Sequence, residues 1–388
     1  MKNILILHQS SELYGSDKTI LLFVTNLDKS KYNPIVILPS EGPLKDEFEK
    51  KQIKVVLAPV LKLHRKIFYP KNFITFLKEY RKSLKILNQL HKENKFDMVY
   101  SHTLAVLIGI IFARKNDIKH LWHIQEVIEK PKVINAIFSK ILSIKANHKI
   151  VYDSQEVMRF WATTPELKAK SDFVWNSLDV NEKPETTTEE RITIRKDFYN
   201  VESDKIVIGL VGRINRWKGQ KLLLEAFAVL LKNNSNIKLV FLGSPPDNQE
   251  IFLTELEDKI KDLKLENDVE IIPFQKDIWK FWDSVDIAVV PSTEPEPFGM
   301  VAIEAMLCKK PVVAANHGGL TEIVLHSQTG FLFEPNNENQ LAEYLQKLLD
   351  NSDLRDDFGK NGYQRVLEHF SIDKHVQKFE QIFEEILR

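Results

Sequence analysis

Short apolar runs alternate with helical patterns twice along this chain, and this alternation constrains the fold more than any other feature. Runs typical of strands lie first at residues 3–8, 33–39, 53–59, 96–102, 118–125, 148–154 and 173–178, and then at 205–212, 237–243, 269–274, 286–292, 311–316 and 330–335. Strands that alternate with helices form parallel sheets covered by helices on both faces. The sequence therefore predicts an α/β fold with two Rossmann-like, doubly wound parallel sheets.

Length, linker composition and charge indicate two domains. A chain of 388 residues exceeds one compact core. Residues 1–180 hold 29 Lys and Arg against 18 Asp and Glu, an excess of 11 positive charges, and the remainder carries an equal negative excess. We expect an N-terminal domain at 1–180, a polar linker at 181–200, a C-terminal domain at 201–371 and a terminal helical segment at 372–388.

The composition favours a reducing compartment and no membrane span. Cys308 is the only cysteine, so no disulfide framework is expected. The apolar stretch 104–113 is shorter than the roughly 20 residues that a span needs and predicts a buried helix. The first apolar run is too short for a signal peptide. We expect a cytoplasmic location, free or peripheral on the inner face of the membrane.

Two strand ends carry residues suited to an anion, and ligands of open α/β sheets bind beyond the strand ends. In "HQSSELYGSDKT" (8–19), Gly15 and Ser16 stand at a predicted helix start, where N–H groups attract an anion. A plain N-cap at Ser16 is the alternative. In "GLVGRINRWKGQ" (209–220), Arg213 and Lys218 suit a diphosphate, and a solvated basic turn is the alternative.

The segment "EPEPFGMVAIE" (294–304) places two carboxylates across a loop and a helix start. Pro297 holds Glu296 in extended geometry, and Gly299 permits a tight turn. Glu304 follows about one and a half turns into the helix, so the carboxylates need not converge on one metal ion. Because the helix start attracts negative charge, they are placed to hold hydroxyl groups on either side of a bound phosphate.

These motifs resemble, in order, those of retaining GT-B glycosyltransferases of family 4. Glu296 and Glu304 match the E-x7-E signature. The other matches are "GSDK" (15–18) to the N-terminal glycine loop, "VWNSLD" (174–179) to the hinge, "GRINRWKG" (212–219) to the donor-phosphate motif and "HGGLTEIV" (317–324) to the GGxxE segment. The resemblance implies a GT-B fold, with two domains facing a central cleft and a last helix that crosses back to the N-terminal domain. Tyr14 and Ser177 depart from the glycines usual in the loop and the hinge.

The resemblance also implies roles for the matched residues. Arg213 and Lys218 would bind the diphosphate of a nucleotide sugar, Glu304 the ribose, and Glu296 the hydroxyls of the donor sugar. The implied donor-binding residues are Gly15, Arg213, Lys218, Glu296, Phe298, Gly299, Met300 and Glu304. The catalytic candidates are Glu296, His102, Arg213 and Lys218, in a front-face substitution that retains the anomeric configuration.

Two histidines of the N-terminal half are further candidates. His102 ends the strand 96–102 and matches a histidine near the donor sugar in this family. His123 also ends a strand and is a candidate for the acceptor side. A structural role inside the core is the alternative for both.

We expect neither a metal nor another cofactor. No D-x-D motif and no Cys/His cluster with ligand spacing occurs, and the resemblance implies metal independence. A hydrolase that uses Glu296 and Glu304 would need carboxyl groups about 5–9.5 Å apart, which the sequence leaves open. A hydrolase, however, needs no phosphate-binding site, and Arg213 and Lys218 suit such a site.

The acceptor is expected on the N-terminal domain, as a saccharide or a lipid-linked saccharide of bacterial surface polysaccharide or glycan assembly. Residues 63–87 interleave basic and aromatic side chains, and 132–145 form a second basic amphipathic segment. Such faces suit an anionic membrane surface, and apolar faces that pack on the sheet are the alternative. No nucleic-acid-binding motif is present, so no nucleic acid is expected.

Two other classes of protein stay open. A nucleotide-sugar epimerase of GT-B architecture would release its product sugar free. A non-catalytic sugar-nucleotide-binding subunit of a glycosylation complex would leave the donor intact. The sequence names neither the base nor the sugar nor the acceptor.

Overall fold

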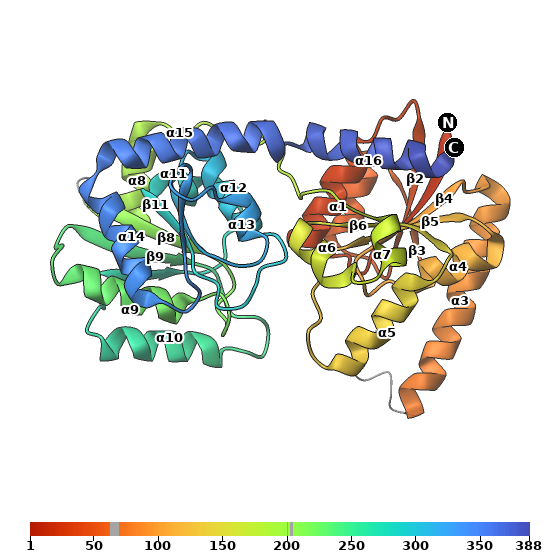
Figure 1. The fold of residues 1–388 in the computed structure, drawn as a ribbon, viewed down its shortest axis with the longest axis horizontal. Coiled ribbons are helices and arrows are strands. Elements are labelled where there is room, and N and C mark those ends of the chain that lie inside the picture. The colour runs from red at the N-terminus through yellow and green to blue at the C-terminus, as the bar shows by residue number, and fades with distance from the viewer. Residues whose placement is uncertain (63–69, 200, 202–204) are drawn as a thin grey trace. The chain divides into compact units, whose positions relative to one another are not determined.

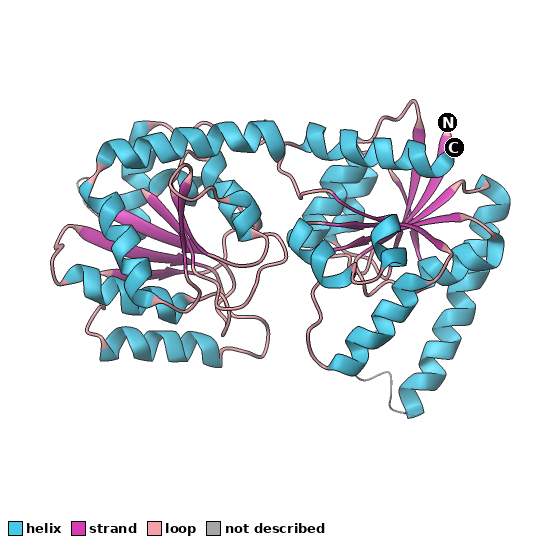
Figure 2. Ribbon diagram, viewed as in Figure 1, coloured by secondary structure: helices cyan, strands magenta, loops and turns pink. Residues whose placement is uncertain are grey.

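The computed structural model describes residues 1–62, 70–199, 201 and 205–388, and the chain divides into two compact units. The first unit comprises Met1–Ser177 and Ile372–Arg388, and the second comprises Leu178–Ser371. Each unit holds a parallel sheet with helices packed on it (Figure 2). The predicted α/β class with two parallel sheets is therefore confirmed.

The first unit is built on a seven-stranded sheet (Figure 1). Its strands are β1 (Lys2–Leu7), β2 (Tyr32–Leu38), β3 (Lys54–Leu57), β4 (Met98–His102), β5 (Lys119–Ile124), β6 (Asn147–Tyr152) and β7 (Ser171–Phe173). They lie in the order β3-β2-β1-β4-β5-β6-β7. The last strand is Ser171–Phe173 instead of 173–178, and Leu178 pairs with Ser371 outside this sheet.

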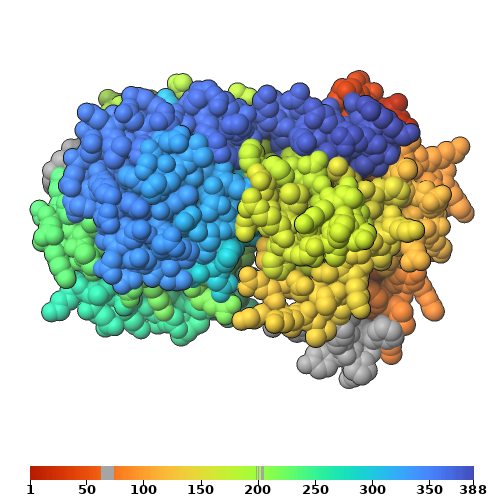
Figure 3. All heavy atoms as spheres, viewed as in Figure 1, coloured from red at the N-terminus to blue at the C-terminus, as the bar shows by residue number. Residues whose placement is uncertain are grey.

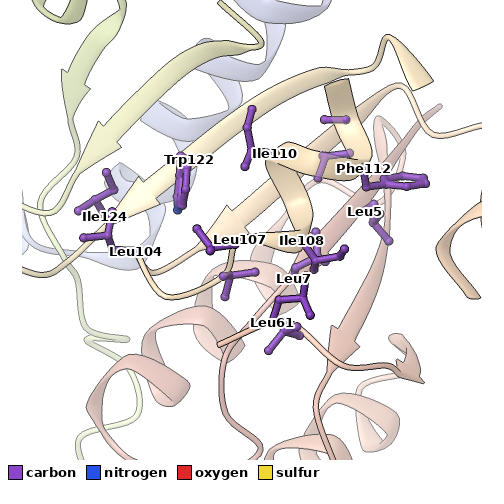
Figure 4. Packing of buried hydrophobic residues seen from close by; sticks show 14 of the residues in the cluster. Leu5, Leu7, Leu61, Leu104, Leu107, Ile108, Ile110, Phe112, Trp122 and Ile124 are labelled. Atoms are coloured by element: carbon purple, nitrogen blue, oxygen red, sulfur yellow. The ribbon is translucent and has the colours of Figure 1, made fainter. Parts of the chain in front are cut away.

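Helices cover both faces of the first sheet. They are α1 (Gly15–Asn26), α2 (Pro43–Lys50), α3 (Pro70–Asn94), α4 (Ile108–Asn116), α5 (Lys132–Ser143), α6 (Gln155–Trp161), α7 (Pro165–Lys170) and α16 (Ile372–Leu387). Alternate residues of β1 point to opposite faces. Leu5 and Leu7 enter a core with Ile108 and Phe112 of α4 (Figure 4), while Ile6 enters a core with α1, α2 and α16.

The last helix, α16, supplies part of the core of the first unit. Its residues Phe379, Ile382 and Phe383 are buried, and the ring centroid of Phe379 lies 4.7 Å from that of Phe23 in α1. Figure 3 shows the helix in dark blue against the red N-terminal segments. The chain therefore completes its first hydrophobic core only when its last residues are in place.

The second unit is built on a six-stranded sheet in the order β10-β9-β8-β11-β12-β13. Its strands are β8 (Ile206–Val211), β9 (Ile237–Leu242), β10 (Val269–Ile272), β11 (Ile287–Val290), β12 (Val312–Ala315) and β13 (Gly330–Phe333). Its helices are α8 (Thr188–Tyr199), α9 (Gln220–Leu231), α10 (Ile251–Asp262), α11 (Trp279–Ser284), α12 (Met300–Leu307), α13 (Leu320–Ile323), α14 (Glu338–Asp350) and α15 (Ser352–His369). Each strand end predicted from the sequence agrees to within two residues.

The segment 181–200, predicted as a linker, differs from that expectation because it contains helix α8. Arg195 of this helix donates from Nε to the carbonyl of Ser284 at 2.7 Å, and its Nη2 lies 2.5 Å from Oδ2 of Asp286. The Tyr199 hydroxyl lies 2.6 Å from Oγ of Ser284. Polar groups thus fasten α8 to the second unit, which explains why its composition suggested a linker.

The predicted buried helix around 104–113 corresponds to α4, in which Ile108 and Phe112 are buried. Over the described residues, no helix combines the length and apolarity that a bilayer crossing demands.

The packing of α16 generates a stability prediction. Phe379→Ala removes a buried ring that packs on Phe23 and Tyr100, so we expect a loss of about 3–5 kcal/mol of unfolding free energy. The neighbouring Gln377→Ala changes an exposed position and should stay within about 0.5 kcal/mol of the parent. Urea unfolding followed by circular dichroism measures both. Equal midpoints for the two variants would show that α16 adds nothing to the core.

Candidate active site

Three loops of the second unit leave neighbouring strands at the same edge of the sheet. β8 pairs with β9 on one side and with β11 on the other, and β11 pairs with β12. The strand order therefore reverses between β8 and β11, which is the switch point where open α/β sheets bind ligands. The segments with Lys218 and with Glu296 follow β8 and β11 directly.

The loop after β8 is held by its own side chains and by one glycine. Oδ1 of Asn215 accepts the backbone N–H groups of Trp217 and Lys218 at 3.1 and 3.0 Å. Gly219, at φ 78°, precedes α9, and a Cβ there would lie 1.9 Å from the carbonyl oxygen of Pro291. Only glycine allows the backbone at residue 219 to lie so close to Pro291, and this contact brings Lys218 toward the loop after β11.

Glu296 is a buried carboxylate with two partners. Its Oε1 lies 2.5 Å from Nζ of Lys218 and 2.5 Å from Oγ of Ser292, and only 8% of its side chain is exposed. Charge-assisted hydrogen bonds of this kind are stronger than neutral ones. Both contacts fall on Oε1, and nothing in the described part of the chain bonds to Oε2. The carboxylate is thus fixed by one oxygen while the other stays available as an acceptor.

The loop after β12 fixes the backbone around Glu296. The N–H of Gly319 donates to the carbonyl of Glu296 at 2.8 Å. A Cβ on Gly318 would lie 2.4 Å from that carbonyl oxygen, and one on Gly319 would lie 2.5 Å from Cα of Phe298. The ring N–H of His317, at Nε2, donates to the carbonyl of Ser292 at 2.8 Å. The paired glycines therefore let one loop lie directly against the other.

Helix α12 begins immediately after this junction. Gly299 caps it at φ 116°, and no side chain among the described residues caps this helix start. Phe298 is 2% exposed and packs with its ring centroid 5.9 Å from that of Phe370. Met300, the first helical residue, is half-buried. A helix start without a capping side chain is suited to a phosphate or another anion.

Two other predicted donor residues come from the loop after β8 and from helix α12. Arg213 is exposed, and its carbonyl accepts a hydrogen bond from Nε2 of Gln220 at 2.9 Å. Glu304 is the fifth residue of α12 and is half-buried. The sequence missed Ser292 and His317, although the paired glycines at 318–319 indicated that this loop approaches another backbone closely.

The predicted N-terminal loop of the first unit begins α1 at Gly15. Gly15 is exposed, and a Cβ there would meet nothing within 4 Å. The cap position is Tyr14 and not Ser16, whose assignment as a plain N-cap is therefore wrong. The N–H of Tyr14 donates to Oδ2 of Asp17 at 2.9 Å, so a side chain three residues along the chain performs the capping.

The candidates His102 and His123 lie in a layer of four buried histidines between the sheet and α16. The ring centroid of His102 lies 4.9 Å from that of His8 and 5.1 Å from that of His123, and His375 of α16 lies 6.5 Å from His123. Burial lowers the pKa of each ring, that of His375 to about 4. These histidines are therefore neutral at pH 7.

Over the described residues, no three His, Cys, Asp or Glu side chains are grouped so that they could hold a metal ion.

The second unit is similar in sequence to a known family. Residues 192–365 match the model of the family described as glycosyl transferases group 1. The match covers most of the second unit and less than half of the whole chain, and the expected resemblance to this group of glycosyltransferases is confirmed over these residues.

Relatives of known name extend over different shares of the chain. The capsular polysaccharide biosynthesis glycosyltransferase CapM of Staphylococcus aureus is 29% identical over 201 residues, 50% of each chain. The lipopolysaccharide 1,2-N-acetylglucosaminetransferase of Salmonella typhimurium is 33% identical and covers 47% of this chain and 49% of its own. The uncharacterized glycosyltransferase MJ1178 of Methanocaldococcus jannaschii is 27% identical over 88% of both. The chain thus spans about half the length of the first two of these relatives and most of the third.

Solved structures match the whole fold. Anabaena Alr3699/HepE, solved in complex with UDP and glucose, has a TM-score of 0.83 at 22% identity, over 99% of this chain and 100% of its own. A glycosyltransferase from Rickettsia africae has a TM-score of 0.82 at 23% identity, over 100% and 99%. The GT-B fold implied by the sequence motifs is therefore confirmed.

The buried histidines generate a pH prediction. Burial lowers the pKa of His120 to about 3 and that of His375 to about 4, against 6.5 in the unfolded chain. Below pH 6.5 the unfolded chain takes up protons that the folded chain does not, so the unfolding free energy falls by up to about 1.4 kcal/mol per pH unit for each histidine. We expect the urea midpoint to fall between pH 7 and pH 5. His375→Gln should reduce this slope, and an unchanged slope contradicts the prediction.

Proposed function

We propose that this chain is a retaining, metal-independent glycosyltransferase that moves a sugar from a nucleotide-diphosphate donor to a saccharide or a lipid-linked saccharide. The observation that carries the proposal is Glu296, a buried carboxylate clamped by Lys218 and Ser292 beside the start of α12. Glu304 follows at the E-x7-E spacing in the same helix. The named relatives in polysaccharide and lipopolysaccharide assembly support this class of acceptor.

The donor would bind at the switch point of the second unit. The start of α12 and the ammonium group of Lys218 would stabilise the diphosphate, with the exposed Arg213 as a second cation. Oε2 of Glu296 would accept hydrogen bonds from the donor sugar, and the half-buried Glu304 would hold the ribose diol. UDP in the similarly folded Anabaena protein supports a nucleoside diphosphate here.

The transfer step would need no general base from a side chain. The bond between the anomeric carbon and the phosphate oxygen breaks, and its electron pair stays on the diphosphate. The acceptor oxygen forms the new bond on the same face, and its proton passes to the departing phosphate oxygen. Lys218, Arg213 and the helix start would stabilise that departing charge, a class of contact typically worth roughly 10²–10³ in rate.

The first unit would supply the acceptor side. Gly15, which no neighbouring atom crowds, would approach the donor, while His102 and His123 would act on sugar hydroxyls. Two helices of this unit also expose apolar side chains: Ile74 and Leu77 on α3, and Val133 and Ile137 on α5.

Exposed basic residues accompany these apolar side chains, namely Lys78, Arg81, Lys82 and Lys85 on α3, and Lys132 and Lys140 on α5. Apolar and basic side chains on one helix suit an anionic membrane surface. The predicted basic and aromatic residues Arg65, Lys66, Phe68 and Tyr69 lie outside the described residues.

Substitution of Glu296 tests the proposed function. Glu296→Gln keeps the size of the side chain and removes its charge, so we expect a transfer rate lowered by at least roughly 10²-fold. A thermal-shift screen of nucleoside diphosphates and nucleotide sugars first finds the donor, since stabilisation grows with concentration over Kd. The variant should keep most of the nucleoside diphosphate shift.

Glu294→Gln is the matched control, because Glu294 is an exposed glutamate two residues earlier whose nearest ion-pair partner is Arg216 at 3.4 Å. It should transfer at the parent rate. Unchanged transfer by Glu296→Gln would refute the role of Glu296. Free product sugar would indicate an epimerase, and donor binding without turnover would indicate a binding subunit.

A vesicle assay tests the membrane surface. Replacement of Ile74, Leu77, Val133 and Ile137 together by Ser should lower cosedimentation with phosphatidylglycerol vesicles by at least about tenfold, since each loses apolar area that the membrane would bury. Ile192→Ser with Ile251→Ser removes exposed apolar side chains of the second unit and should change nothing. Equal binding by both sets, or none by the parent, would rule out this surface.

A further inference from the structure

A chain of three buried polar side chains joins α1 to the ends of β1 and β4. Oδ1 of Asp17 lies 2.6 Å from Nε2 of His8, and Nδ1 of His8 lies 2.9 Å from Nδ1 of His102. None of the three is more than 2% exposed. Two hydrogen bonds in series thus connect a carboxylate to the histidine that the sequence singled out. The position of each proton in this chain follows from the chemistry of the partners.

The carboxylate sets the proton on His8. Burial alone would raise the pKa of Asp17, but the hydrogen bonds from His8 and from the N–H of Tyr14 outweigh it and lower that pKa. The ionised carboxylate only accepts hydrogen bonds, so Nε2 of His8 must carry the proton. Burial lowers the pKa of His8, which leaves the ring neutral and its Nδ1 an acceptor.

His8 in turn sets the proton on His102. Because Nδ1 of His8 is an acceptor, Nδ1 of His102 must be the donor in their hydrogen bond. A neutral His102 then has no proton on Nε2. That nitrogen is buried and has no hydrogen-bond partner among the described residues. His102 thus presents a bare acceptor nitrogen, whose orientation is fixed by a carboxylate two hydrogen bonds away.

His123 carries its proton on the ring nitrogen opposite to that of His102. The Tyr100 hydroxyl lies 2.7 Å from Nδ1 of His123, and burial raises the pKa of this phenol well above its usual value. Since the hydroxyl has no other acceptor in the described part of the chain, it donates to His123. Nε2 of His123 therefore carries the proton, and it too is buried without a partner.

We propose that Asp17 and His8 are positioning residues that fix His102 as a hydrogen-bond acceptor, while Tyr100 fixes His123 as a donor, and that the two Nε2 atoms bind one hydroxyl group between them. A hydroxyl both donates and accepts, so it matches a bare nitrogen and an N–H on rings whose centroids lie 5.1 Å apart. The hydroxyl belongs to a sugar or to a water molecule. The assignment of the hydroxyl to a sugar rests on the proposed function, whereas the fixed tautomers of the histidines do not.

Asp17→Asn tests the direction of these hydrogen bonds, because the substitution should reverse the donor and the acceptor in each of them. The Tyr14 N–H needs an acceptor, so the amide oxygen takes that place and the amide NH₂ faces Nε2 of His8. Nε2 of His8 must then accept, Nδ1 of His8 must donate to His102, and His102 must carry its proton on Nε2. The variant keeps the capping contact of α1, so the fold is expected to survive.

Nitrogen-15 NMR of the full chain with labelled histidine reads these tautomers directly, with His8 and His102 assigned from single substitutions. In the parent we expect the proton on Nε2 of His8 and on Nδ1 of His102, and in Asp17→Asn the reverse. Asp28→Asn changes an exposed carboxylate of the same unit, which binds Ser30, and should leave both tautomers unchanged. A parent His102 protonated on Nε2, or no reversal in Asp17→Asn, overturns the proposal.

Enzyme kinetics then test whether the hydroxyl belongs to a sugar. Asp17→Asn should lower kcat by at least roughly tenfold with little change in donor KM, because the variant offers a donor where the hydroxyl needs an acceptor. Its thermal shift with nucleoside diphosphate should match the parent, since that site lies in the second unit. Reversed tautomers with parent kcat would refute a sugar hydroxyl at these two nitrogens. If the parent protein bound no nucleotide, the proposed function would be refuted. The NMR measurement of the histidine tautomers would still test the positioning roles of Asp17 and His8.

Discussion

The approach of two loops in the second unit governs the candidate site. Gly318 and Gly319 lie so close to the backbone of Glu296 and Phe298 that any Cβ would collide, and the N–H of Gly319 binds the Glu296 carbonyl. This contact sets where the carboxylate of Glu296 can reach. The hydrogen bonds of Lys218 and Ser292 then fix it, so a side chain with several rotatable bonds keeps one position before any ligand arrives.

The first unit depends on a different kind of constraint. Its sheet face at β1, β4 and β5 ends in His8, His102 and His123, which an ordinary core would leave as costly buried polar groups. Asp17, Tyr100 and the carbonyl of Trp175 satisfy one nitrogen each on His8, His123 and His375. Helix α16 covers this layer, so the last residues of the chain help to determine the environment of residues near its beginning.

The sequence predicted the fold class and nearly all strands, because buried parallel strands are short, apolar and bounded by turns. It also placed Glu296 and Lys218 after strand ends, which the structure confirms for neighbouring strands. It missed α8, since hydrogen bonds of Arg195 and Tyr199 help to hold that helix and leave no periodic signal. It missed Ser292, His317, His8 and Asp17 as well. Each acts through hydrogen bonds to a side chain or to a backbone group, and such bonds leave no periodic signal in the sequence.

The sequence by itself determined which residues stand at the strand ends, because hydrophobic periodicity and glycine positions are local properties that one chain displays directly. It also determined the spacing of Glu296 and Glu304, which a single helix fixes. Only the tertiary structure decided that Lys218 pairs with Glu296 and that His8 links Asp17 to His102. Those contacts join segments up to 94 residues apart, and their geometry depends on how strands pair and on which glycines let backbones meet.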